Sequence, residues 1–153
     1  MRSDMEQMIK KYNIITLFNR KDIAEIENEL REDEHVLIMY PCSVLENELK
    51  TLAKAIGNPM VGKASGVFAL TDQRMIFCAN VFFRHVYKEI AREDITECTV
   101  TVGEMICALT VYSKEHAWAV NLPIRPQNLS EDLRDVLSYY IYPKDNDQEG
   151  EDN

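Results

Sequence analysis

Segment 66–77 constrains the fold more than any other part of the chain. It contains two apolar runs of strand length, joined by the polar residues 71–74. Valine, phenylalanine, isoleucine and threonine favour half-buried extended strands, so two such runs with a short polar link predict a β-hairpin. An Asx-type turn, in which the Asp72 carboxylate accepts the amide of Arg74, would reverse the chain. We therefore expect the rest of the protein to be built around a sheet.

Further strands are predicted on both sides of this hairpin. One covers residues 36–42, where Pro41 is expected to place the far end of the strand at an edge or a bulge. Segments 82–91, 95–102, 105–112 and 117–122 each alternate apolar and polar residues, and Gly103-Glu104 predicts a two-residue turn between two of them. The total is seven strands.

Four segments carry apolar residues at the spacing of amphipathic helices. The first lies within residues 1–18, and the second begins at Asn19, which we expect to form a capping box with Asp22. A third helix is predicted over residues 44–56, between two strands, and a fourth over residues 128–141. The apolar stripe of the first helix is formed by Met5, Met8, Ile9, Tyr12 and Ile15.

The size and apolar content of the chain predict one domain. It has 153 residues, of which 46% are hydrophobic, enough for a buried core. No run approaches the ~18 apolar residues that a membrane span needs, and residues 1–18 lack the continuous apolar block of a signal peptide. We expect a cytoplasmic protein.

The net charge of −9 is unevenly distributed. Residues 19–34 hold seven acidic and three basic residues, and residues 143–153 hold five acidic residues and one lysine. Residues 61–92 are basic, with five basic and two acidic residues. Because a charged tail with few apolar residues cannot bury enough surface to fold, we predict three parts: a helical segment at 1–18, a folded domain at 19–142 and an acidic disordered tail at 143–153.

The sequence contains no arrangement of residues that is typical of a catalytic, cofactor or metal site. Phosphate-binding loops, nucleophile elbows and paired histidine motifs are missing. The four cysteines lie in apolar segments without a C-x-x-C pair, which favours reduced core thiols, with Cys42 the most accessible beside Pro41. We expect neither an enzyme nor a bound cofactor or metal.

Three segments resemble the bacterial pleckstrin-homology-like domains of the YokE type. They are the acidic lead-in 32–36, the hairpin GVFALTDQRMIF at 66–77 and the sequence IAREDI at 90–95. The resemblance covers residues 23–141 and leaves out 1–18 and the expected helix at 44–56. It implies an α+β fold, a small antiparallel β-barrel or sandwich of about seven strands capped by a C-terminal α-helix. It also implies a binding or scaffolding module.

The basic residues of the middle segment are the candidate ligand-binding residues. Eukaryotic pleckstrin-homology domains hold inositol phosphates with lysine and arginine, and the counterparts here are Lys63, Arg74, Arg84, Lys88 and Arg92. They are spread over at least three predicted strands of an acidic molecule, so a solvated sheet face is favoured, with weak or no phosphoinositide or membrane binding. A nucleic-acid interface is not expected, because the basic residues form no stripe with interleaved aromatics.

Protein–protein interaction or homo-oligomerisation is the predicted function. Strand 75–79 is apolar on both faces, so one face must be covered from outside the sheet. The stripe Met5, Met8, Ile9 and Tyr12 is a candidate interface for a partner or a second copy, although the N-terminal helices could also cover the strand within one chain. The alternative function is an acidic decoy that blocks a basic nucleic-acid-binding surface of another protein, with steep salt dependence.

Overall fold

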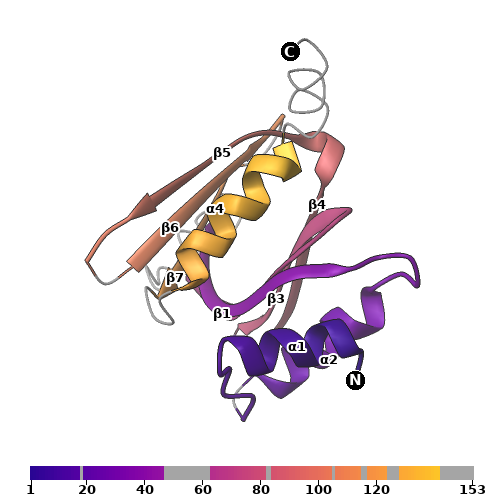
Figure 1. The fold of residues 1–153 in the computed structure, drawn as a ribbon. Coiled ribbons are helices and arrows are strands. Elements are labelled where there is room, and N and C mark those ends of the chain that lie inside the picture. The colour runs from indigo at the N-terminus through magenta and orange to yellow at the C-terminus, as the bar shows by residue number, and fades with distance from the viewer. Residues whose placement is uncertain are drawn as a thin grey trace.

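The computed structural model describes residues 1–17, 19–46, 63–81, 84–104, 106–114, 117–123 and 128–141. Two helices precede seven strands, and a longer helix follows them (Figure 1). The helices are α1 (Ser3–Lys11), α2 (Arg20–Glu29), the short 3-10 turn η2 (Arg92–Asp94) and α4 (Asn128–Ile141). The strands are β1 (Val36–Glu46), β2 (Lys63–Thr71), β3 (Arg74–Val81), β4 (Arg84–Ala91), β5 (Ile95–Val102), β6 (Ile106–Ser113) and β7 (Ala117–Pro123).

The strands are antiparallel and hydrogen-bonded in the order β4-β3-β2-β1-β7-β6-β5. Strand β1 pairs with β2 along its length but with β7 only over residues 43–46, so it joins a four-stranded part to a three-stranded part. In the described residues no ladder connects β4 to β5, so the strands do not close into a barrel. Figure 1 shows α4 lying across β5, β6 and β7.

The core fills the space between the two parts of the sheet and α4. The predicted alternation in the last two strands is confirmed, and α4 contributes its apolar stripe. The residues of β6, β7 and α4 that form this part of the core are at most 5% exposed, and they are Cys107, Leu109, Val111, Val120, Leu122, Leu129, Leu133, Leu137 and Tyr140.

The predicted hairpin is present as β2 and β3, but the turn is made differently. The hydroxyl of Thr71 accepts hydrogen bonds from the amides of Gln73, at 3.1 Å, and Arg74, at 3.0 Å. The Asp72 carboxylate instead accepts the amide of His35, at 3.0 Å. The expected Asx turn is therefore wrong, because the start of β1 lies beside the turn and takes this carboxylate. At Gly66 the strands approach so closely that a Cβ would collide with the Cys78 carbonyl oxygen.

Helix α1 is shorter than the apolar spacing predicted. Asn13 adopts a left-handed conformation, with φ of 52°. The Asn13 amide donates a hydrogen bond to the Lys10 carbonyl, and the Ile14 amide donates one to the Ile9 carbonyl. These two bonds form a Schellman motif, which ends the helix. Ile15, predicted on the buried stripe, is 70% exposed as a result.

Helices α1 and α2 cover the outer face of the four-stranded part, with α1 on β1 and α2 on β2 and β3 (Figure 1). Ile23 and Ile26 of α2 are buried, and residues 75–79 of β3 are fully buried. The chain thus covers its doubly apolar strand by itself. Helix α2 begins after Asn19 as expected, but the Asn19 side chain makes no capping bond, and Asp22 is buried instead.

Three predictions about the strands need correction. Residues 44–46 belong to β1 and not to the predicted helix 44–56, whose remainder lies outside the described residues. The far end of β1 was predicted to be an edge because of Pro41. Residues 43–46, which follow Pro41, pair with both β2 and β7, so this end of the strand lies inside the sheet. Val102 pairs with Cys107, so the link between β5 and β6 is longer than two residues.

Within the described part of the chain, no helix is long and apolar enough to cross a membrane.

Candidate functional site

The five basic candidates do not form one cluster. Strands β2 and β4 run in the same direction on either side of β3, so their first residues, Lys63 and Arg84, lie at one end of the sheet. Arg74 opens β3 and Arg92 follows β4, which places both at the opposite end. Lys88 is half-buried in the middle of β4. The side chains of Lys63 and Arg84 are outside the described part.

Arg74 is a buried structural cation. Its residue is 5% exposed, and its guanidinium bonds the Glu34 carboxylate from Nε and from Nη2, both at 2.9 Å. Nη2 also donates to the Glu29 carbonyl at 2.6 Å, and Nη1 donates to Glu89 and to the Tyr87 hydroxyl. All five N–H donors of the arginine are used, so none is left for a ligand.

Glu34 is the main partner of Arg74, and it is completely buried. Burial alone would raise the pKa of this carboxyl, but hydrogen bonds from Arg74 and Thr71 outweigh it and hold the pKa below its usual value. The Thr71 hydroxyl donates to Glu34 at 2.6 Å. The network connects the turn of the hairpin to the loop after α2, and through Glu89 to β4.

Arg92 also has a structural role, because it caps the end of α4. Its Nε and Nη2 donate to the carbonyls of Tyr140, at 2.8 Å, and Tyr139, at 2.9 Å, and its Nη1 donates to the Asp72 carbonyl at 3.2 Å. The guanidinium lies 4.8 Å from the centre of the Tyr140 ring. A cation at this position complements the negative end of the helix dipole.

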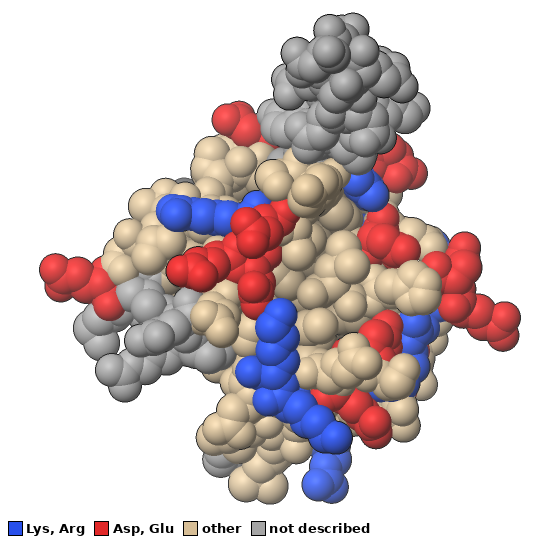
Figure 2. Space-filling model, in the orientation of Figure 1, with Lys and Arg blue, Asp and Glu red and all other residues tan. Residues whose placement is uncertain are grey.

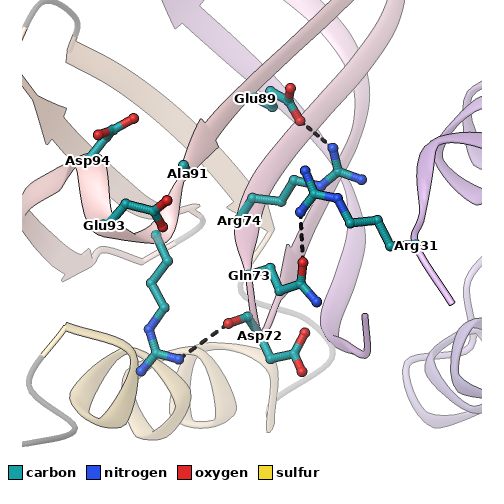
Figure 3. A pocket seen from close by; sticks show the side chains of 9 residues that line it. Arg31, Asp72, Gln73, Arg74, Glu89, Ala91, Glu93 and Asp94 are labelled. Atoms are coloured by element: carbon teal, nitrogen blue, oxygen red, sulfur yellow. Dashed lines mark hydrogen bonds and ion pairs between the residues drawn. The ribbon is translucent and has the colours of Figure 1, made fainter. Parts of the chain in front are cut away.

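A pocket of about 480 Å³ lies between these two arginines (Figure 3). Arg31 lines it as well, and donates to the Gln73 side chain at 2.7 Å. Four carboxylates share the lining, so neither sign of charge dominates. The lining residues are Arg31, Asp72, Gln73, Arg74, Glu89, Ala91, Arg92, Glu93 and Asp94.

A cluster that the sequence did not reveal joins α2 to β3 and β4. The Cys78 sulfur lies 3.8 Å from a carboxylate oxygen of Asp22 and 4.0 Å from Nε2 of His85, which lies 3.5 Å from Glu25. Burial raises the pKa of Cys78 to about 12, so the thiol is neutral at neutral pH and not a nucleophile. In the residues that the structure describes, no three such side chains are placed to hold a metal. The sequence hinted at this cluster through Asp22 and Glu25, two acidic residues that lie three positions apart on α2.

The predicted interface stripe of α1 packs inside its own chain. Met5 is fully buried and Tyr12 is 2% exposed, while Met8 and Ile9 are partly buried against the core. The Tyr12 hydroxyl donates to Asp132 of α4 at 2.6 Å.

Among the described strands, β4 and β5 form the two edges of the sheet. Four of the eight residues of β4 are a lysine, an arginine, a glutamate or a histidine: Arg84, His85, Lys88 and Glu89. Strand β5 contains Glu97 as its one charged residue and is otherwise built from threonine, valine, isoleucine and cysteine. Charged side chains protect an edge strand from pairing with another chain, and β5 has only one such side chain among its eight residues.

The class of protein follows from the family model that the chain matches. The model of the family described as Bacterial PH domain matches residues 30–130. Similar solved structures include the C-terminal domain of an unknown protein from Leishmania infantum, at 12% identity and a TM-score of 0.49, covering 80% of this chain and 94% of that one. The N-terminal PH domain of Vps36 has 13% identity and a TM-score of 0.43, covering 71% and 86%. A structure with the PH and C1 domains of the Vav1 exchange factor has 11% identity and a TM-score of 0.49, covering 92% of this chain and 37% of that one.

The fold is that of a pleckstrin-homology-like domain, as predicted, with N-terminal helices, seven antiparallel strands and a C-terminal helix. The chain belongs to the bacterial PH domain family, because the match spans more than half of its length. No curated protein matches it. Families of PH-like domains are generally non-catalytic and commonly bind proteins.

Proposed function

We propose that this chain is a non-catalytic binding module that holds an extended segment of a protein partner, or of a second copy of itself, against the edge of β5. The observation that carries the proposal is the contrast between the two edges. Strand β4 is rich in charge, whereas β5 has one charged residue in eight and a sequence of high strand propensity.

The backbone of β5 supplies the affinity in this proposal. Strand β5 pairs with β6 on one side, and in the described residues no strand pairs with it on the other. The amides and carbonyls of that free side can extend the sheet by one strand, which is a common way to bind an extended peptide. Glu97, Thr99 and Thr101 are exposed, so these side chains are accessible to solvent.

The apolar residues beside β5 supply the specificity. Cys98 and Val100 are half-buried and pack against the core, as does Val136 of α4. Helix α4 packs against β5, and in this proposal the three side chains provide an apolar floor for the added strand. An added strand places alternate side chains on such a floor.

The acidic decoy has less support. The face drawn in Figure 2 carries acidic and basic side chains intermixed, and no continuous acidic surface appears on it. A decoy for a basic groove needs one sign of charge over an extended surface.

The test compares wild type with Thr99→Lys/Thr101→Lys, which adds charge to the β5 edge at two exposed positions. Light scattering after size exclusion measures self-association, and selection from a library of displayed peptides measures binding to a partner segment. We expect wild type to self-associate at micromolar concentration or to select extended apolar peptides, and the variant to lose this binding at least tenfold.

The matched control is Gln7→Lys/Ser138→Lys, which adds the same charge at exposed positions on α1 and α4. It should bind as wild type does. The proposal fails if wild type neither self-associates nor selects any peptide, or if both variants lose binding equally.

A further inference from the structure

The loop between α1 and α2 presents two aliphatic side chains to solvent. Ile15 and Leu17 are each 70% exposed, while Tyr12 and Ile14 on the same loop are buried and fix it to the body of the protein. The Schellman motif at Asn13 sets where the chain leaves α1. The exposed pair therefore stands on an anchored loop.

Positively charged residues flank this pair on both sides along the chain. Residues 8–21 contain no acidic residue, although the chain as a whole has a net charge of −9. Four cations, all exposed, flank the loop: Lys10 and Lys11 at the end of α1, and Arg20 and Lys21 at the start of α2. Lys11 pairs with Asp132 at 2.9 Å. In Figure 2 blue side chains lie at the α1 and α2 end of the molecule, with red side chains next to them.

The stability of the fold does not explain these residues. Arg20 and Lys21 occupy the first turn of α2, where the helix dipole disfavours positive charge. Ile15 and Leu17 leave most of their apolar surface in water. Both features are locally unfavourable in the isolated protein, and both become favourable where an apolar phase lies beneath a negatively charged layer.

We propose that the α1–α2 loop docks this protein on an anionic lipid surface. Ile15 and Leu17 enter the boundary between headgroups and acyl chains, and the four cations lie at the level of the lipid phosphates. A lipid surface has an apolar interior beneath a charged headgroup layer, which fits an exposed apolar pair flanked by cations. A protein partner would need a concave apolar pocket with an acidic rim to bind the same loop.

The net charge does not prevent this docking. Charges are screened beyond about 8 Å at physiological salt, so the cations at the contact outweigh the acids elsewhere on the molecule. The inference thus reverses the expectation of weak membrane binding, which rested on the total charge and on the separate basic segment 61–92. It is independent of the β5 edge.

The test is co-sedimentation of the full chain with vesicles of phosphatidylcholine, with or without phosphatidylglycerol. We expect binding to the anionic vesicles that weakens with salt. Ile15→Ser/Leu17→Ser should lower the partition coefficient at least about tenfold, since it removes most of the buried apolar area. Lys10→Gln/Arg20→Gln/Lys21→Gln should abolish the preference for the anionic lipid.

Two variants serve as controls, because they change similar side chains far from the loop. Tyr139→Ser removes a side chain that is 67% exposed on α4, and Lys114→Gln removes an exposed cation after β6. Neither should change vesicle binding. The proposal is overturned if the protein does not sediment with anionic vesicles, or if the loop variants and the controls lose binding equally.

Discussion

The two edges of the sheet differ in what holds them. On the β4 side, Arg74 connects β3 to Glu89 of β4, to the buried Glu34 and to the end of α2. The β5 side has α4 beside it and no buried ion pair among its described residues. Part of the charge of segment 61–92, which suggested a ligand site, therefore fixes β3 and β4 to the rest of the fold. Strand β5 has a single charged residue, Glu97, and is the edge that we propose binds a partner.

The largest effect is expected on the β4 side. Arg74→Met leaves the Glu34 carboxylate, whose side chain is 0% exposed, buried without its cation. We expect a loss of about 3–5 kcal/mol in the free energy of unfolding, measured by urea denaturation. Arg74→Met/Glu34→Leu should regain much of this loss, since no buried charge is then left unpaired and the side chain of Glu89 is 45% exposed to water. If both variants are equally unstable, the packing of these side chains, and not the pairing of their charges, accounts for the stability.

The pH dependence of stability tests the same pair. Glu34 has a lowered pKa in the folded protein, so its stabilising effect is present above its ordinary value of 4.5 and is lost as the pH falls through the folded value. The difference in unfolding free energy between wild type and Glu34→Gln should shrink below pH 4.5. Other carboxylates cancel because both proteins contain them. A difference that does not vary with pH contradicts the assignment.

Arg92 lies at the junction between the two edges, in η2. Arg92→Gln removes the cap on the last carbonyls of α4, and we expect a cost of about 1 kcal/mol in unfolding free energy. Arg31→Gln is the control, because Arg31 lines the same pocket but bonds Gln73 in an exposed position. Its effect should stay within about 0.5 kcal/mol. Equal effects would mean that Arg92 does not act through the helix end.

The smallest effect on stability is expected at β5. Thr99→Lys/Thr101→Lys alters exposed side chains, so the free energy of unfolding should change by no more than about 0.5 kcal/mol. Thermal and urea unfolding of this variant would establish that its loss of binding comes from the edge itself. A loss of several kcal/mol would mean that the edge is part of the core.

Local patterns predicted much of the fold. Alternation placed Leu109 and Val120 in the core, and helical spacing placed Leu133 on the inner face of α4. The rest depends on contacts between distant residues. Arg74 and Glu34 are 40 positions apart, so the charge count could not show that they pair. The exposure of Ile15 was not predicted, because the helical spacing of apolar residues continues past Asn13, where the helix ends.

Amide hydrogen exchange of the complex between this protein and a selected extended peptide, or of its self-associated form, tests the central claim most directly. Binding at β5 predicts new protection of amides within Ile95–Val102, with the amides of β4 unchanged. New protection in β4, or in neither strand, would contradict the assignment of β5 as the binding edge.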